Sequence, residues 1–367
     1  MKIGVLKERN DNRVAINPDY VKILSEQDHE VFVETNAGQL AYIYDDEYKE
    51  NGAKILSREK VLSQSDLIVS IHPMEEKEIK SLAKSSVYVS SFRPFVEDTF
   101  LKILSSAGLT AFSLDMIPRI SLAQSMDILS SMASISGYKA VLMAANHMPR
   151  YFPMLTTAAG TIPPAKVLVL GAGVAGLQAI ATSKRLGAVV EAFDTRAAAK
   201  EEVQSLGAKF VEVEGAQDDK GAGGYAVEQT EEYKQKQRDL IFEKVTKSDV
   251  VITTAQLRGR PAPTLVTKEM VDIMKPGAVI VDLASSTGGN CELSKDNDIV
   301  IHNNVTIIGN SELSSDVAQH ASQLYSKNIQ NYFKEVLKDG QINFDMENPI
   351  IQSSCIVKEG KILYGNK

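Results

Sequence analysis

The chain has 367 residues, of which 44% are hydrophobic and 24% charged, a composition typical of a soluble globular protein with more than one core. Forty Lys and Arg residues against 47 Asp and Glu residues give a net charge of −7, which excludes a broad basic surface for nucleic acid or anionic lipid. The two cysteines, Cys291 and Cys355, are too few for a disulfide framework or a cysteine-rich metal centre. We therefore expect neither nucleic-acid binding nor a metal site.

The apolar segments predict neither export nor direct membrane insertion. The longest apolar stretch, 167–177, contains three glycines and is far shorter than the roughly 20 residues that a spanning helix needs. The N-terminus is a short apolar strand interrupted by charges, without the longer apolar stretch of a signal peptide.

The N-terminal third of the chain, up to about residue 118, alternates short apolar strands with amphipathic stretches. This alternation is the pattern of a parallel α/β sheet. A long helix is predicted next, over 123–148, because apolar residues recur near helical spacing and Pro149 follows. The expected strands include 31–33, 67–69 and 87–89, and the expected helices include 20–27 and 99–107.

A second alternation follows the Thr161-Ile162-Pro163-Pro164 sequence and predicts a second doubly wound sheet. The tail contains a helix around 317–329 and a strand-like stretch, 351–357, and is too short to form a domain of its own. We therefore expect an α/β protein with two Rossmann-like doubly wound domains, mainly parallel sheets and long connecting helices. The first domain would comprise 1–125 and 314–367, and the second 126–313. The six strands expected in the second domain are 166–170, 189–193, 209–213, 250–253, 278–281 and 305–308.

The most specific local motif is the glycine sequence Gly171-Ala172-Gly173-Val174-Ala175-Gly176, between a predicted strand and a predicted helix. In this context Gly171 permits a tight turn, Gly173 lets the backbone approach a pyrophosphate, and Gly176 allows close helix packing. The helix N-terminus then stabilises the anion. This motif predicts a dinucleotide site.

Asp194 ends the next strand, where a carboxylate accepts hydrogen bonds from the adenosine ribose and repels a 2′-phosphate. The nearby Arg196 argues in the other direction, because an arginine can pair with that phosphate. The carboxylate lies nearer the expected ribose position, so NAD is favoured over NADP.

A polar cluster, Arg119, Gln124, Asp127 and Ser130, is predicted at the start of the long helix, with the last three on one helical face. The cluster is either a solvated first turn or a surface that faces a ligand, and the spacing alone does not decide. None of these groups is a good proton shuttle at neutral pH. They are suited to holding a carboxamide and a ribose.

The glycine-rich segment 215–228 is either a solvated linker or a flap that closes over a ligand.

Several motifs together resemble the proton-translocating nicotinamide nucleotide transhydrogenases, in particular their separate NAD(H)-binding alpha-1 component. The family also includes alanine dehydrogenase. The resemblance runs along essentially the whole chain. Its most specific motifs are PRISLAQSMDILSSMA at 118–133, GAGVAGLQAIATSKRLGAVVEAFDTR at 171–196, GGYA at 223–226, KPGAVIVDLASSTGGNCE at 275–292 and the helix 318–328.

The resemblance implies roles for individual residues. The polar cluster would surround the nicotinamide and its ribose. Gln256 would lie beside the adenine, where the family commonly has an apolar residue, and 285–287 replaces a more usual acidic or amide-containing stretch. The adenosine half would be lined by Val174, Asp194, Thr195 and Arg196, and the closing loop would include or adjoin Gly224, Tyr225 and Gln237.

The reaction implied is direct hydride transfer between NADH bound here and NADP bound on a partner subunit, which needs no general base. The resemblance also implies a homodimer, a membrane-spanning partner, and a cytoplasmic position at the inner face of the membrane. Alanine dehydrogenase remains an alternative, but it needs a lysine and a histidine in the first domain, and His72 is the only possible substitute in 68–73 and 88–92. A non-catalytic NAD-sensing module is a third hypothesis, against which the intact polar cluster argues.

Overall fold

A computed structural model describes residues 1–213 and 230–365. Its contacts divide the chain into two compact units, and each is described separately below. One consists of Met1–Met132 and Ser315–Lys367, and the other of Ala133–Ser314.

The first unit is built on an eight-stranded sheet in the order β19-β18-β6-β5-β4-β1-β2-β3. Strands β1 to β6 pair in parallel, whereas β18 and β19 join the edge of the sheet through antiparallel pairings. The strands are β1 (Lys2–Val5), β2 (Glu30–Glu34), β3 (Lys54–Leu56), β4 (Leu67–Val69), β5 (Val87–Ser90), β6 (Thr110–Ser113), β18 (Cys355–Lys358) and β19 (Lys361–Ile362).

Helices cover this sheet, so its central strands are buried on both faces. Every residue of β4 and β5 is buried, and such strands form continuous apolar runs. The N-terminus of α1 has a local cause, because the side chain of Asn17 accepts the N–H of Tyr20 and Pro18 occupies the first helical turn. The helices are α1 (Pro18–Glu26), α2 (Asp45–Glu50), α3 (Arg58–Gln64), α4 (Glu76–Ile79), α5 (Thr99–Ser106), α11 (Ala318–Val336) and α12 (Pro349–Ser354).

The second unit contains a seven-stranded sheet in the order β11-β10-β9-β12-β13-β15-β14. Six strands are parallel, as the sequence predicts, and their carboxyl ends therefore lie along one edge of the sheet. The strands are β9 (Lys166–Leu170), β10 (Val189–Phe193), β11 (Lys209–Phe210), β12 (Val250–Thr253), β13 (Val279–Asp282), β14 (Asp298–His302) and β15 (Val305–Gly309). The helices are α7 (Val174–Arg185), α8 (Ala199–Ser205), α9 (Glu231–Lys247) and α10 (Lys268–Ile273).

The α/β class and the two mainly parallel sheets are thus confirmed, but the strand list was incomplete. Strand β14 pairs antiparallel with β15 and was missed. The two strands are joined by Asn303 and Asn304, both with positive φ, the backbone conformation of a type I′ hairpin turn. These consecutive asparagines were the sequence signal for the hairpin.

The prediction of one continuous helix over 123–148 was wrong. Residues Ser121–Met126 form a 3₁₀ helix, η3, and Asp127 is extended, with ψ 93°. Helix α6 (Ile128–His147) begins only after it. The carboxylate of Asp127 accepts the main-chain N–H of Ser130 at 3.0 Å, which caps the new helix. Competition from this side chain for the backbone donor explains the break.

The strand-like stretch 351–357 was also only partly correct. Helix α12 continues to Ser354, and the strand starts at Cys355. Asn348 caps the helix by accepting the N–H of Ile350, and Pro349 occupies its first turn. These two residues favour a helical start, although the β-branched residues that follow favour a strand.

Among the described residues, α6 is the one helix that is long and apolar enough to cross a membrane by length and composition. The second unit buries part of it completely, because Ala140, Val141 and Ala144 are 0% exposed in that unit's core. Over its apolar window the helix is 39% buried.

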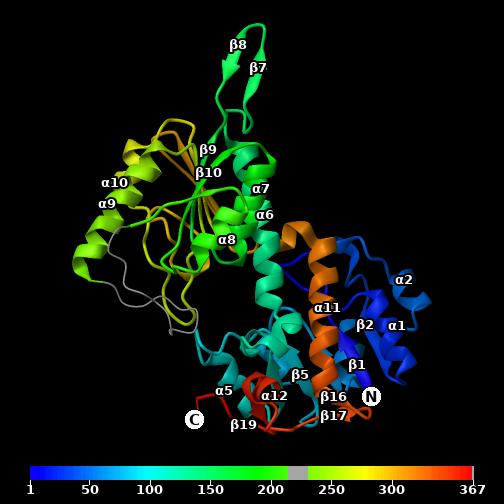
Figure 1. The fold of residues 1–367 in the computed structure, drawn as a ribbon. Helices are drawn as coiled ribbons and strands as arrows, with labels where there is room; N and C mark the ends of the chain where they lie inside the picture. The colour runs from blue at the N-terminus through cyan, green and yellow to red at the C-terminus, as the bar shows by residue number, and fades with distance from the viewer. Residues whose placement is uncertain (214–229, 366–367) are drawn as a thin grey trace. The chain divides into compact units, whose positions relative to one another are not determined.

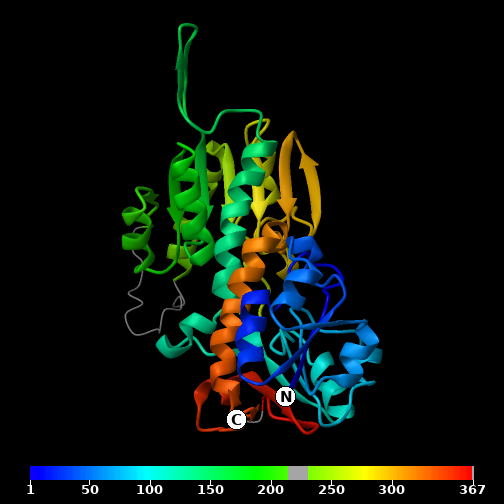
Figure 2. The same ribbon diagram turned by 90° about the vertical axis from the view of Figure 1, so that its right-hand side faces the viewer.

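A β-hairpin formed by β7 (Leu155–Thr157) and β8 (Gly160–Ile162) projects away from the sheet of the second unit (Figure 1, Figure 2). The sequence analysis used Thr161-Ile162-Pro163-Pro164 only to mark the start of the second alternation and did not predict this hairpin. Tyr151, Met154 and Ile162 are 55%, 62% and 44% exposed, so the hairpin and its base carry apolar side chains into solvent.

Candidate nucleotide-binding site

The glycine motif forms a tight turn between β9 and α7. Gly171 has φ +99°, a conformation that side chains with a Cβ rarely adopt. A Cβ on Gly176 would lie 1.9 Å from the carbonyl oxygen of Gly171, so the helix approaches the strand closely only because this residue is glycine. At Gly173 a Cβ would meet nothing within 4 Å, so this side of the loop is open.

The start of α7 has the features of an anion site. Gly173 is the N-cap, and no side chain caps the helix. The N–H groups of the first helical turn have no partner within the helix itself, and the helix dipole favours a negative group beside them. An open cradle at Gly173 next to these donors fits a pyrophosphate.

Asp194 follows β10 and is tied to the glycine loop. Its Oδ2 accepts the N–H of Ala172 at 2.7 Å, and its Oδ1 accepts the N–H of Arg196 at 2.8 Å. The guanidinium of Arg196 donates to both oxygens, with Nε to Oδ1 and Nη2 to Oδ2 each at 3.0 Å. Thr195, which lies between the two members of this pair in the sequence, is exposed. Val174, the first residue of α7, is exposed as well.

The carboxyl end of β12 also reaches the glycine loop. Thr254 donates its hydroxyl to the carbonyl of Gly171 at 3.0 Å. Gln256 lies two residues further on and donates its side-chain amide to the carbonyl of Leu283 at 2.8 Å. Gln256, a predicted site residue, is exposed. Its bond to Leu283 anchors it at the same edge of the sheet as the glycine loop.

Two buried polar residues that sequence analysis missed organise this edge. Asp282, 0% exposed, accepts the hydroxyl of Thr253 at 2.9 Å and the N–H of Asn290 at 2.8 Å. The side chain of Asn290 bonds in turn to both main-chain polar groups of Ala255. An acidic residue at the end of an otherwise apolar strand was the available signal. These bonds fix the loop that carries Gln256.

Two further groups of this region, Ser285 and Cys291, are held away from ligand chemistry. Ser285, in the 3₁₀ helix η4 (Ser285–Thr287), donates its hydroxyl to Asp296 at 2.6 Å. Burial raises the pKa of the Cys291 thiol to about 11, so this cysteine is not a nucleophile at neutral pH.

The second predicted cluster lies in the first unit. Arg119 and Gln124 are exposed, whereas Asp127 and Ser130 are half-buried. Besides capping α6, the Asp127 carboxylate accepts the Ser130 hydroxyl at 2.6 Å. Asp127 and Ser130 are therefore brought together by the helix cap, and the prediction that Gln124 shares one helical face with them was wrong.

Helix α11 fixes the segment that carries Gln124. The side chains of Asn328 and Asn331 both donate to the carbonyl of Ser125, at 2.9 and 3.2 Å. Asn328 is buried. Sequence analysis missed this pair as positioning residues, because the bonds join positions that are about 200 residues apart.

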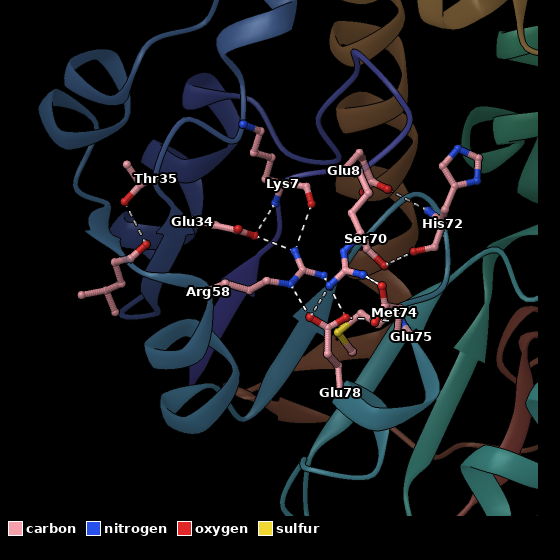
Figure 3. A network of polar contacts seen from close by, with 12 residues as sticks. Lys7, Glu8, Glu34, Thr35, Arg58, Ser70, His72, Met74, Glu75 and Glu78 are labelled. Carbon is pink, nitrogen blue, oxygen red and sulfur yellow. Dashed lines mark hydrogen bonds and ion pairs between the residues drawn. The ribbon is translucent and has the colours of Figure 1, made fainter.

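The carboxyl ends of β1, β2 and β4 in the first unit are held by internal polar contacts (Figure 3). Arg58 bonds to Glu78 at 2.7 Å and to Glu34 at 2.8 Å. The Glu8 carboxylate accepts the main-chain N–H groups of Ile71 and His72 at 2.7 and 3.1 Å. This edge of the first sheet thus uses its charged groups to join its own loops.

His72, the possible substitute for a catalytic histidine, is paired with a carboxylate. Its Nε2 lies 2.8 Å from Oδ2 of Asp11, which is buried and also bonds to the buried Arg13. Although burial acts to raise it, the pKa of Asp11 is held well below its usual range by the hydrogen bonds of Arg13 and His72 and by the Arg13 charge. His72 is therefore part of a polar cluster with Asp11 and Arg13.

Three further predicted residues lie on or beside the glycine-rich segment. Gly224 and Tyr225 lie outside the described residues. Gln237 lies in α9 and is half-buried.

The family comparisons match nearly the whole chain. The family described as "Alanine dehydrogenase/PNT, C-terminal domain" matches residues 140–365, and the corresponding N-terminal domain matches residues 4–136. The chain belongs to the alanine dehydrogenase/PNT family, as its motifs predicted.

Transhydrogenase alpha subunits are among the similar members of this family. The chain is 44% identical to a Rhodospirillum rubrum protein described as the first portion of NAD(P) transhydrogenase subunit alpha, over 99% of this chain and 98% of that protein. A crystal structure of a transhydrogenase from Sinorhizobium meliloti has a TM-score of 0.87 at 37% identity and covers 100% of both chains. An alanine dehydrogenase of Staphylococcus epidermidis is 30% identical over 83% of this chain and 77% of that protein.

Proposed function

We propose that this chain is the NAD(H)-binding alpha component of a proton-translocating transhydrogenase. The observation that carries the proposal is the glycine turn, because Gly173 leaves an open cradle at an uncapped helix N-terminus while Gly176 packs against Gly171. The full-length similarity to the Rhodospirillum rubrum transhydrogenase protein supports the same conclusion. The pyrophosphate of NAD(H) would lie at this turn and the adenosine ribose at Asp194.

The polar cluster of the first unit would hold the nicotinamide end. Bound NADH supplies a hydride from C4 of its nicotinamide, to be passed to NADP on a partner subunit. The amide of Gln124 and the guanidinium of Arg119 are hydrogen-bond donors for a carboxamide or a phosphate, and Asp127 and Ser130 are polar partners for a ribose. The helix cap fixes these last two side chains relative to each other.

No residue of this cluster needs to move a proton. Hydride exchange between two nicotinamides leaves the proton count of both rings unchanged, so a general base is not required. The four cluster residues, Arg119, Gln124, Asp127 and Ser130, contribute by position, by orienting the ring and by excluding water. In the structure the ring of His72 contacts Asp11 through Nε2.

The decisive assay compares two reactions of the purified chain. The chain alone should show no reduction of NAD with alanine. With its membrane-spanning and NADP-binding partner subunits, it should support hydride exchange between NADPH and an NAD analogue. Activity with alanine would favour the alanine dehydrogenase hypothesis. NADH binding without either reaction would favour the NAD-sensing module.

The same proposal includes a homodimer and a peripheral cytoplasmic position at the inner face of the membrane, reached through the partner subunits. The exposed apolar side chains at the β7–β8 hairpin, including Met154 and Ile162, support self-association because such groups are stabilised by burial. Sedimentation analysis should give a dimer mass for the full chain. A monomer at micromolar concentration would contradict this aspect of the proposal.

A further inference from the structure

The carboxylate of Asp194 has its hydrogen-bonding capacity filled by this chain's own groups. It accepts four N–H donors: two from the main chain, at Ala172 and Arg196, and two from the guanidinium of Arg196. An ionised carboxylate offers about four acceptor positions. In this arrangement no position remains for the two hydroxyls of a ribose.

The four donors differ in how easily they can leave. The N–H of Ala172 belongs to the glycine turn, and the N–H of Arg196 lies two residues along the chain from the carboxylate itself. Both are fixed by the backbone. The guanidinium is on a flexible side chain that is 32% exposed, whereas the Asp194 side chain is 9% exposed. The guanidinium is therefore the group that a ribose would displace.

We propose that Arg196 is an internal competitor of the nucleotide: its guanidinium occupies Asp194 in the empty site and must withdraw before the adenosine ribose binds. This inference rests on the proposed NAD(H)-binding function. The guanidinium presents two donors, one to each carboxylate oxygen, which is the pattern that two vicinal hydroxyls would present. Arg196 thus sets the affinity of the site without belonging to the glycine turn.

The competition has a defined kinetic form. When only the fraction of molecules with an open Asp194 binds nucleotide, the apparent dissociation constant rises by the inverse of that fraction. The pair is bidentate and partly shielded from solvent, so we expect it to be closed in roughly nine molecules out of ten, which weakens binding about tenfold. If the Arg196 side chain opens and closes faster than NADH binds, the loss of affinity lowers the association rate constant and leaves the dissociation rate constant unchanged.

Arg196→Ala tests the proposal in the full chain. Stopped-flow fluorescence with NADH should show an association rate constant about tenfold higher and an unchanged dissociation rate constant. A matched control is Arg150→Ala, which removes another arginine from an aspartate pair, with Asp249 at 3.3 Å. That aspartate accepts the N–H of Lys166, at the opposite end of β9 from the glycine turn, so NADH binding should not change.

A double-mutant cycle identifies the partner through which Arg196 acts. In an Asp194→Asn background the side-chain pair is already weakened, so Arg196→Ala should no longer accelerate association. An equal gain in both backgrounds would overturn the proposed competition at Asp194. Slower association, or faster dissociation, in Arg196→Ala alone would show instead that the arginine supports the bound nucleotide. If the wild-type chain bound no NADH, the proposed function itself would fail.

Discussion

A β-carbon on Gly176 would lie 1.9 Å from the carbonyl oxygen of Gly171, while a β-carbon on Gly173 would meet no atom within 4 Å. Two glycines of one motif therefore have separable roles, one in packing and one toward the ligand. Gly176→Ala should lower the free energy of unfolding by about 1–3 kcal/mol, because the helix must move away from the strand. Urea unfolding followed by circular dichroism measures this loss.

Gly173→Ala should leave the free energy of unfolding close to the wild-type value, since the new methyl group has space and φ is −74°. It should weaken NADH binding at least tenfold, because the methyl group occupies the cradle proposed for the pyrophosphate. Isothermal titration of both variants separates the two roles. Tight NADH binding by Gly173→Ala would place the pyrophosphate elsewhere.

Asp194→Ala should weaken NADH binding about tenfold and change NADPH binding much less. The preference of the chain for NADH over NADPH should therefore become smaller. The wild-type carboxylate would face the 2′-phosphate of NADPH, and the variant removes that repulsion while it frees the Arg196 guanidinium. Cofactor fluorescence titration gives both dissociation constants. Equal affinity of the wild-type chain for NADH and NADPH would contradict the role given to Asp194.

Gln124→Asn should reduce hydride transfer by roughly 100-fold in the complex reconstituted with its partner subunits, because the amide is withdrawn by about one methylene. NADH affinity of the isolated chain should change little, since the Gly173 and Asp194 contacts are in the other unit. Single-turnover kinetics and equilibrium titration measure the two effects separately. A parallel loss of rate and affinity would make Gln124 an ordinary binding residue, and no change in either would make it a solvated surface residue.

Asp11 should make the stability of the chain depend on pH in the acid range. Its pKa is lower in the folded state than its ordinary value of 3.8, so its stabilising contribution is complete above that value and is lost as pH falls below it toward the folded-state pKa. Asp11→Asn should lower the free energy of unfolding by about 3 kcal/mol at pH 7, because the buried Arg13 loses its counter-ion.

The deficit of Asp11→Asn relative to wild type should shrink as the pH is lowered from about 4 to about 2, because the wild-type chain then loses the same interaction. Urea unfolding at several pH values measures it. Asp46→Asn is the control, since Asp46 is 84% exposed and pairs with Lys49 in solvent. A constant deficit across this pH range would exclude the pairing of an ionised Asp11 with Arg13 and His72 as its cause.

Sequence patterns predicted the features of this protein that depend on neighbours along the chain. The alternation of apolar strands and amphipathic helices predicted six parallel strands of the second sheet, and the glycine spacing predicted the turn at Gly171. The strand β14 was missed because it is largely exposed, and its signal lay in the turn residues Asn303 and Asn304. The break at Asp127 was missed because the spacing of apolar residues carries no information about side-chain hydrogen bonds. The carboxylate of Asp127 takes the main-chain N–H of Ser130, and the helix starts anew there.

The sequence by itself determined the family, the α/β class and the glycine turn, since each depends on residue types at short, fixed spacings. Only the tertiary structure decided how polar groups are paired. Asp194 was predicted to face a ribose, and folding brings the N–H of Ala172 to its carboxylate from 22 residues away. Asn328 is joined to Ser125 across about 200 residues in the same way. Such pairings follow from which segments the folded chain brings together, because a buried polar group takes whatever partner lies within hydrogen-bond reach.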